Sequence, residues 1–128
     1  MPTRFDIEET VRGMLEDEFH VRLLKMRLPV GVKANGETRY HEFDCVSPDQ
    51  QIVAEIKTNK LKASASKPNG RYYSAIKWAL LGDVYMLGRI CAAKKYLVLT
   101  DEPLFKVCKQ DMDGILPENT AILLKGIE

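Results

Sequence analysis

Asp44, Glu55 and Lys57 are the residues of this chain whose types and spacing are best suited to chemistry. They lie in the segment 40–57, which reads Tyr-His-Glu-Phe-Asp-Cys-Val-Ser-Pro-Asp-Gln-Gln-Ile-Val-Ala-Glu-Ile-Lys. Two carboxylates that converge beside an ammonium group suit a hard cation and a phosphate group. For these side chains to meet, the backbone must bring residues 44 and 55 together on one face.

A β-hairpin over 40–57 does this. Two runs rich in β-branched and aromatic residues flank the turn-forming cluster Ser47-Pro48-Asp49-Gln50. Folding the chain about Pro48-Asp49 pairs Asp44 with Val53. Because strand side chains alternate between faces, one face is apolar and carries Phe43, Cys45, Ile52, Ala54 and Ile56. Asp44, Glu55 and Lys57 share the other face, with Asp44 and Glu55 as diagonal neighbours about 7–8 Å apart at the backbone.

The rest of the chain supplies the elements that must hold this hairpin. Apolar periodicity and turn signals predict helices at 6–19, 71–93 and 103–109, and further strands at 26–32, 96–100 and 121–124. A buried strand directly after the 71–93 helix indicates a parallel crossover. The predicted order is therefore α-β-β-β-α-β-α-β, an α/β fold in one domain spanning 1–128.

Composition limits the classes of protein. The chain has 128 residues, 45% of them hydrophobic, and a net charge of +1, so its overall charge does not indicate a nucleic-acid-binding protein. The cysteines Cys45, Cys91 and Cys108 show neither zinc spacing nor a disulfide framework, and we expect them to be reduced core residues. Without a signal-like segment or a membrane span, we expect a cytoplasmic protein with no membrane partner.

This element order, with Asp44 on the second strand and Glu55-Ile56-Lys57 on the third, resembles the PD-(D/E)XK nuclease superfamily. Restriction endonucleases, archaeal Holliday-junction resolvases and many repair nucleases belong to it. The resemblance runs from the first helix through the strand 96–100. It implies a restriction-endonuclease-like core, a mixed β-sheet flanked by helices, followed here by a C-terminal helix and strand.

The chain departs from the family pattern in one place. Phe43 precedes Asp44 where the family name implies a proline. A literal Pro48-Asp49 pair does occur, but it sits at the predicted turn. About 20 Å of extended strand would separate Asp49 from Glu55, too far for the two to share one metal ion.

The resemblance and the residue chemistry imply a Mg²⁺ ion, with Mn²⁺ as the alternative, held by Asp44 and Glu55. Such an ion lowers the pKa of bound water and polarises a phosphate oxygen. The resemblance adds the backbone carbonyl of Ile56 as a further ligand. Lys57 would position the attacking water or stabilise charge in the transition state. The competing interpretation is a surface salt bridge between Lys57 and one carboxylate, which contributes little to stability.

Other acids are weaker candidates. Family members often add an acid from the first helix, and the run Ile7-Glu8-Glu9-Thr10-Val11 is similar to their apolar-Glu-x-x-Val pattern. That similarity points to Glu8, with Glu9 as its alternative and Glu18 a distant third, although acids near a helix N-terminus also serve the helix itself. Glu42 would lie opposite Glu55, where we favour plain exposure. His20 and His41 receive no role, His41 because it shares a face with Phe43.

Basic residues lie close behind the hairpin. Between residues 56 and 82 there are six basic side chains and no acidic one. The functional interpretation is phosphate contact beside the catalytic strand, and the alternative is an ordinary solvated loop. The candidates are Lys60, Lys62, Lys67, Arg71 and Lys77, the last because it matches in place a polar residue that the family often carries facing the site.

The sequence thus predicts a Mg²⁺-dependent endonuclease acting on DNA, with RNA as an alternative substrate. The main competitor is a non-catalytic nucleic-acid-binding or assembly domain that retains the fold. A third interpretation is an enzyme that uses the same carboxylates on another phosphate-bearing substrate. The helix 71–93 is apolar almost all round, which predicts either a sandwiched core helix or a homodimer formed through it.

Overall fold

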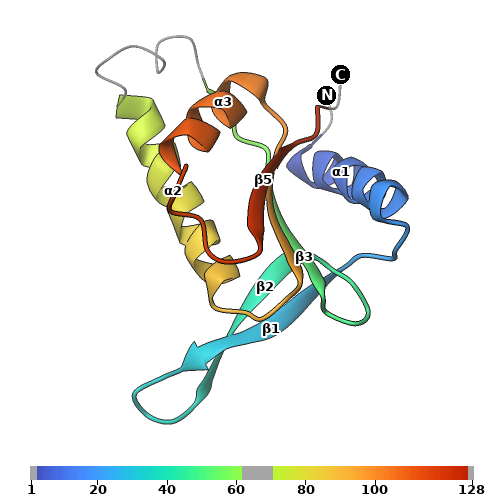
Figure 1. The fold of residues 1–128 in the computed structure, drawn as a ribbon, viewed down its shortest axis with the longest axis vertical. Helices are drawn as coiled ribbons and strands as arrows, with labels where there is room; N and C mark the ends of the chain where they lie inside the picture. The colour runs from blue at the N-terminus through green and yellow to red at the C-terminus, as the bar shows by residue number, and fades with distance from the viewer. Residues whose placement is uncertain (1–2, 62–70, 127–128) are drawn as a thin grey trace.

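The computed structural model describes residues 3–61 and 71–126, with the side chains of residues 71–73 left out. Within these ranges the chain forms three helices and five strands in the predicted order (Figure 1). They are α1 (Arg4–Phe19), β1 (Leu24–Val32), β2 (Thr38–Val46), β3 (Ile52–Lys57), α2 (Arg71–Gly88), β4 (Lys94–Leu99), α3 (Glu102–Asp111) and β5 (Thr120–Leu124).

The strands form one mixed sheet in the order β1-β2-β3-β4-β5. β1 pairs antiparallel with β2, and β2 pairs antiparallel with β3, as hairpin connections require. β4 is parallel to both β3 and β5, because α2 and α3 form the crossovers on either side of it. The prediction of an α/β fold with a mixed sheet flanked by helices is confirmed.

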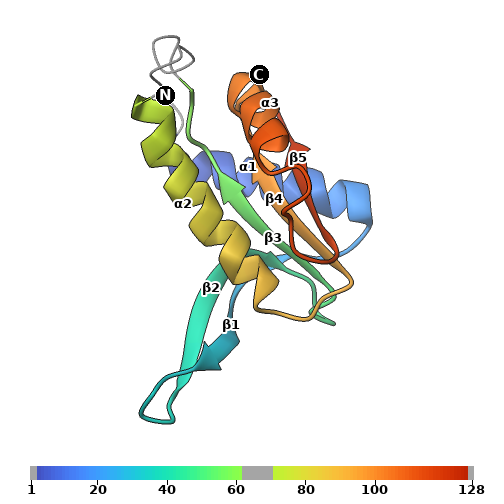
Figure 2. The same ribbon diagram turned by 60° about the vertical axis from the view of Figure 1, so that its left-hand side comes forward.

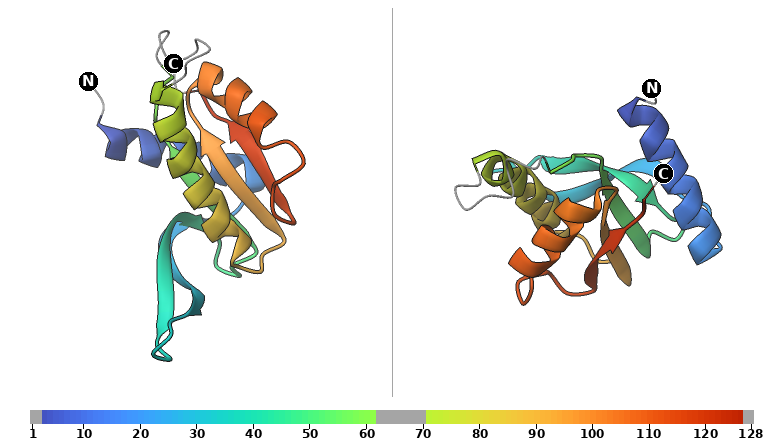
Figure 3. Two further views of the ribbon diagram at one scale, coloured as in Figure 1. Left: turned by 90° about the vertical axis from the view of Figure 1, so that its left-hand side faces the viewer. Right: turned by 90° about the horizontal axis from the view of Figure 1, so that it is seen from above.

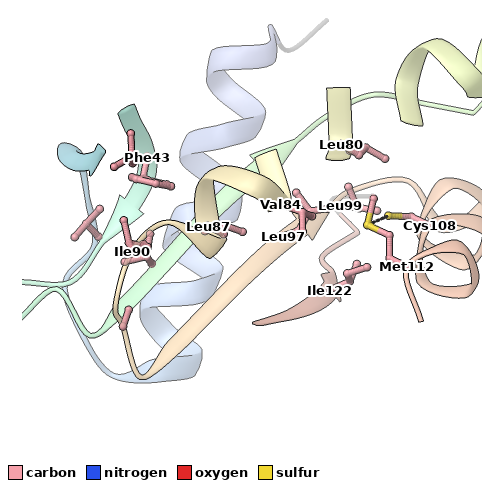
Figure 4. Close-up of a cluster of buried hydrophobic side chains, with 14 of the residues drawn as sticks. Phe43, Leu80, Val84, Leu87, Ile90, Leu97, Leu99, Cys108, Met112 and Ile122 are labelled. Atoms are coloured by element: carbon pink, nitrogen blue, oxygen red, sulfur yellow. Dashed lines mark hydrogen bonds between the residues drawn. The ribbon is translucent and has the colours of Figure 1, made fainter. Parts of the chain in front are cut away.

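The helices divide between the two faces of the sheet (Figures 2 and 3). α2 and α3 cover one face and build the larger core with it, which Figure 4 shows through residues such as Phe43, Leu80, Leu97 and Cys108. α1 covers the other face, where its buried Val11 and Leu15 belong to a second cluster formed with Cys45, Ala54, Ile56 and Val98. β3 therefore contributes to both cores, with Val53 on the α2 side and Ala54 and Ile56 on the α1 side.

α2 is amphipathic rather than apolar all round. Its buried side chains, Ile76, Leu80, Val84 and Leu87, recur at helical spacing and face the sheet. On the outer face Trp78 is 73% exposed and Tyr85 is 63% exposed, so neither aromatic residue belongs to the core. The helix ends at Gly88, five residues before the predicted end. Neither α2 nor any other helix in the described ranges is long and apolar enough to cross a membrane.

The distal part of the β1–β2 hairpin, residues 30–40, projects from the body of the molecule, and we call it the arm (Figures 1 and 3). Its tip is the predicted Asn-Gly turn, in which Gly36 has a φ of 90° that favours glycine. Lys33 N–H donates to the Glu37 carbonyl at 2.7 Å and closes the turn. Where the arm meets the body, β1 and β2 run beside α2.

The cysteines occupy two different environments. All three are free thiols, and Cys45 and Cys108 are buried as predicted. Burial raises the pKa of the Cys45 thiol to about 12, so it stays protonated in the core. Cys91 is exposed just after α2, and the prediction that it is a core residue is wrong. The early end of α2 explains this, because Cys91 lies in the connection to β4.

Candidate functional site

The pairing of β2 with β3 is shifted by two residues from the predicted register. Val53, expected opposite Asp44, pairs with Val46. Ser47 causes the shift, because its N–H donates to the Ile52 carbonyl and its hydroxyl accepts from the Ile52 N–H, both at 3.0 Å. A shift of two residues leaves every side chain on its face but brings Asp44 level with Glu55 instead of diagonal to it.

Asp49 belongs to the turn, as expected. Its carboxylate accepts from the Ser47 hydroxyl at 2.7 Å and from the Gln51 N–H at 3.1 Å. These hydrogen bonds lower the pKa of Asp49. Asp49 thus lies beyond one end of β3, while Glu55 lies near the other.

β2 carries an irregularity at Asp44 that the sequence did not reveal. Leu24 of β1 pairs with Val46, but Met26 pairs with Phe43, so two steps along β1 match three along β2. This is the count of a β-bulge, which reverses the alternation of side chains on the bulged strand. Phe43 accordingly packs in the core beneath α2, whereas Cys45 packs in the core beneath α1. The prediction that Phe43 and Cys45 share one face is wrong.

At the bulge, carboxylates take the place of backbone partners. Asp44 N–H donates to Glu55 Oε1 at 3.2 Å, and Ile56 N–H donates to Asp44 Oδ2 at 2.8 Å. Each acid is thereby held by the backbone of the opposite strand. The structure brings Asp44 and Glu55 together, as the sequence predicts, and fixes their orientation more tightly than a simple hairpin would.

Lys57 pairs with an acid that sequence reasoning missed. Its Nζ lies 3.0 Å from Oδ2 of Asp83 on α2. The contact is close enough for an ion pair, but this buried oxygen has no well-directed hydrogen bond within the described ranges. Asp83 is the one acidic residue in the sequence of α2. An isolated acid in a strongly apolar helix was the signal that could have found it.

His41 is a second residue that sequence reasoning set aside. Its Nε2 lies 3.2 Å from Glu55 Oε2, and its ring packs edge-on against Phe43 with the ring centres 4.6 Å apart. The two rings do share a face, as predicted. The bulge turns that face toward Glu55, so His41 reaches the acids from which it was expected to point away.

These side chains line one polar hollow of about 300 Å³ between α1, β2, β3 and α2. Glu8 of α1 also lines it and lies 3.8 Å from Arg4 and 4.0 Å from Lys25, measured between the charged atoms. Five carboxylates line the hollow, from Glu8, Glu42, Asp44, Glu55 and Asp83, together with the basic side chains of Arg4, Lys25 and Lys57. Glu42 is exposed at the edge, so the other four acids are the ones crowded inside.

The protonation of the buried acids reflects this crowding. Burial, followed by the charges of Asp44 and Asp83, raises the pKa of Glu55 to about 9. Burial also raises the pKa of Asp83, although the nearby Lys57 opposes the shift. Without a further cation, Glu55 is therefore neutral at pH 7.

The chemistry of the donors suits Mg²⁺, because the acids offer only hard oxygen ligands. Their present geometry suits it less well. In the described part of the chain, no three His, Cys, Asp or Glu residues are grouped as a metal site. Asp44 Oδ2 and Glu55 Oε1 accept from backbone N–H groups instead. An ion would have to use the remaining lone pairs of these carboxylates, or follow a small rotation of their side chains.

The other predicted acids lie outside this cluster. Glu9 is exposed on α1, and Glu18 pairs with Lys125 near the opposite end of that helix. Glu42 lines the edge of the hollow and is exposed, as expected, but it pairs in register with Arg27 on β1 and is not opposite Glu55.

Of the five predicted phosphate-binding side chains, the structure describes those of Lys60 and Lys77. Lys60 is exposed, Lys62 and Lys67 lie outside the described residues, and the side chain of Arg71 is not described. Lys77 forms an ion pair with Asp111 of α3 at 3.5 Å and lines a different hollow, so the expectation that it faces the site is wrong. Comparisons with protein families, with curated proteins and with solved structures found no match to this chain.

Proposed function

We propose that this chain is a metal-dependent nuclease of the PD-(D/E)XK type that hydrolyses phosphodiester bonds in DNA. One observation carries the proposal: Asp44, Glu55 and Lys57 line the same polar hollow, with Glu8 of the first helix beside them. The mixed sheet supports it, because the acids lie on the second and third strands and are reached by helices from both layers.

In this proposal Asp44 and Glu55 would hold Mg²⁺ or Mn²⁺, with the Ile56 carbonyl as a further ligand. The ion would supply positive charge that stabilises the transition state of phosphoryl transfer and would lower the pKa of water. Glu55 would hold the ion in its charged form, which its raised pKa disfavours in the metal-free protein. His41 Nε2 lies 3.2 Å from Glu55 Oε2 and helps to orient this carboxyl group.

Lys57 acts on the reacting phosphate. Asp83 holds its ammonium group at the edge of the hollow, where the Lys57 side chain remains 32% exposed. A lysine held in this way is oriented before substrate arrives, and such pre-organised charge is effective in catalysis. Asp83 is therefore a positioning residue for Lys57.

A non-catalytic nucleic-acid-binding or assembly domain is the second candidate. It is favoured by the hydrogen bonds that tie Asp44 and Glu55 to the backbone, since these acids are partly satisfied without a metal ion. Pure binding, however, gives no reason to bury several acids around one hollow, where each lowers the affinity for a polyanion.

A cleavage screen separates the two candidates. Plasmid, linear duplex, branched and single-stranded DNA, together with RNA, should be incubated with Mg²⁺ or Mn²⁺, and we expect cleavage that chelation abolishes. Lys57→Ala should lose the activity. Lys106→Ala is the matched control, since Lys106 also pairs with an acid but lies exposed on α3. Binding without cleavage under any divalent metal would favour the non-catalytic domain.

A homodimer through α2 remains a prediction with reduced support. The helix buries its main apolar face in this chain's own core, and among its described side chains Trp78 and Tyr85 are the exposed large apolar ones. A dimer would still suit cleavage of both strands of a duplex. Sedimentation at micromolar concentration measures it, and a purely monomeric species would contradict it.

A further inference from the structure

A basic groove lies between the arm and the C-terminal half of α2. It has a volume of about 530 Å³, and its lining includes Lys33, Arg39, Tyr85 and Arg89 but no acidic residue. We call these four residues the basic groove. Arg89 is fixed in place, because its Nε donates to the Val30 carbonyl at 2.8 Å. The Arg89 guanidinium lies beside Gly31, where a Cβ would be 3.4 Å from one of its nitrogens.

The cations of the basic groove differ from other basic residues of the chain in their partners. Lys25, Lys57 and Lys77 each pair with a carboxylate. No such ion pair is formed by Lys33, Arg39 or Arg89 within the ranges that the structure describes. Three unpaired cations around one concavity create a positive potential that attracts a polyanion.

The outer face of α2 carries an aromatic stripe that leads into this groove. Trp78, Gly82 and Tyr85 follow one another at helical spacing on the same face, and Arg89 comes directly after the end of the helix. The two aromatic residues, which are 73% and 63% exposed, lie about 10 Å apart along the helix axis. Gly82 between them is exposed, and a Cβ there would contact nothing within 4 Å. Packing therefore does not require the glycine, which leaves the surface between the rings flat.

The basic groove adjoins the polar hollow along β2. Arg39 of the groove precedes His41 of the hollow by two residues, so the two lie on the same side of the strand about 7 Å apart. On α2, Asp83 of the hollow and Tyr85 of the groove are two residues apart and therefore point to different sides of the helix. A chain molecule bound at the hollow can extend into the groove along β2.

We propose that the basic groove and the aromatic stripe bind a single-stranded segment of nucleic acid. Unpaired cations bind the phosphates, and exposed aromatic rings stack on bases. In a duplex the base faces are already stacked on one another, so rings of this kind favour unpaired bases. Binding of a single strand does not depend on catalysis. The substrate preference that it implies rests on the proposed function: the nuclease would cleave substrates that have unpaired bases next to the scissile bond.

The single tryptophan of the chain provides a direct test, since every change in indole emission reports on Trp78. The protein should be titrated in a chelator, to prevent cleavage, with oligothymidylate of about 12 nucleotides and with a duplex of equal length. We expect saturable quenching by the single strand and at least tenfold weaker binding of the duplex. Affinity should fall with salt, because phosphate contacts release counterions.

Variants locate the site. Lys33→Glu with Arg39→Glu should weaken single-strand binding at least tenfold and flatten its salt dependence. Tyr85→Ala should weaken it by about fivefold or more, the loss of one stacked base. Lys106→Glu with Lys109→Glu is the control, because it changes the net charge equally on α3, away from the groove.

Several results would overturn the proposal. These are duplex binding as tight as single-strand binding, equal losses in the groove and control variants, or emission from Trp78 that does not respond. An emission shift with protein concentration alone would assign the stripe to a second copy of the chain. Single-strand binding without any cleavage would support the groove proposal and contradict the nuclease proposal. Cleavage without a preference for single strands would support the nuclease proposal and contradict the groove proposal.

Discussion

Glu55 is stabilised in its neutral form although the proposed chemistry needs its charge. Its carboxyl group lies among Asp44, Asp83, His41 and Lys57, and burial with the two acidic charges raises its pKa to about 9. The folded chain therefore binds a proton that the unfolded chain releases at about pH 4.5, the ordinary pKa of this side chain. A residue that opposes folding in this way is typical of a functional site.

Glu55→Gln should stabilise the metal-free protein at alkaline pH. In the wild type the stability linked to Glu55 is complete below about pH 4.5 and is lost as the pH rises toward about 9. Glutamine can still accept from the Asp44 N–H but has no proton to lose. At pH 9 the gain should exceed about 1 kcal/mol, the value of a single pKa unit. The pKa of Asp83 is also raised, so the free energy of unfolding of the variant should still fall with pH, but less steeply than that of the wild type.

Urea unfolding in a chelator at pH 5, 7 and 9 measures this effect. Wild type and variant should be nearly equal at pH 5 and diverge as the pH increases. Asp49→Asn is a useful comparison, because Asp49 is exposed and its pKa is lowered. Equal pH dependence in the wild type and Glu55→Gln would show that Glu55 is not held neutral.

Asp83→Asn should separate positioning from structure at Lys57. The amide keeps the shape of Asp83 but cannot neutralise the ammonium group 3.0 Å away. Misplacement of a catalytic group costs up to about 10²-fold in rate, so the cleavage rate should fall by one to two orders of magnitude. Removing this negative charge also lowers the pKa of Glu55, so activity should rise at a lower pH.

The pH–rate profile distinguishes the two effects. A variant that is merely less stable would lose activity without a shift of the pH–rate profile. Asp111→Asn is the matched control, because Asp111 on α3 forms an ion pair with Lys77 on α2, away from the hollow. A profile for Asp83→Asn that coincides with the wild type would exclude the coupling between Asp83 and Glu55.

At the scale of the elements, α2 joins the two halves of the proposed machinery. One side of the helix gives Asp83 to the polar hollow, and its outer face gives Trp78 and Tyr85 to the stripe and the groove. Arg89 of the groove follows the end of the helix. The sequence of α2 shows the apolar spacing that places the helix on the sheet. The polar residue that faces the acids is set by the rotation of the helix over β2 and β3, which the sequence does not give. The sequence therefore predicted Lys77 at this position, whereas the structure places Asp83 there.

Gly82→Ala should stabilise the protein, because Gly82 lowers the helix propensity of α2. A glycine in an exposed helix interior destabilises by about 1 kcal/mol relative to alanine. Because a Cβ there meets nothing within 4 Å, alanine should raise the free energy of unfolding by nearly that amount. Denaturant unfolding measures the gain. Unchanged stability would mean that the unfolded chain or the helix geometry offsets the propensity.

The hairpin of β2 and β3 shows where sequence reasoning stops at this scale. Its turn residues and its alternating pattern predict two strands and bring Asp44 close to Glu55. They do not predict the extra residue in β2, because a bulge is defined only by pairing with β1. His41 was assigned to the wrong side of the site for this reason alone. The Ser47 hydrogen bonds that set the register were likewise hidden among several suitable turn residues.

At the scale of the molecule, local patterns were sufficient for the order of the elements and the class of fold. Helical and strand periodicities switch clearly along the chain, and a helix between two buried strands leaves a parallel crossover as the natural connection. The projecting arm was not predictable, since the sequence of β1 and β2 gives no sign that their distal ends leave the body. The basic groove depends on that projection and was missed with it.

Because the polar hollow and the basic groove consist of different residues, we expect that cleavage and binding can be changed separately. Lys57→Ala should reduce cleavage by about 10²–10³-fold, the cost of a lost transition-state contact, and leave single-strand affinity within a few-fold of the wild type. Lys33→Glu with Arg39→Glu should weaken binding broadly and leave the rate at saturating substrate nearly unchanged. On a plot of rate against affinity, measured with one labelled oligonucleotide, the two variants should fall on different axes. If Lys57→Ala cleaves as the wild type does, the assignment of the hollow as a nuclease site is wrong. If both variants lose binding alone, the hollow and the groove form one binding surface, and the non-catalytic domain becomes the better account.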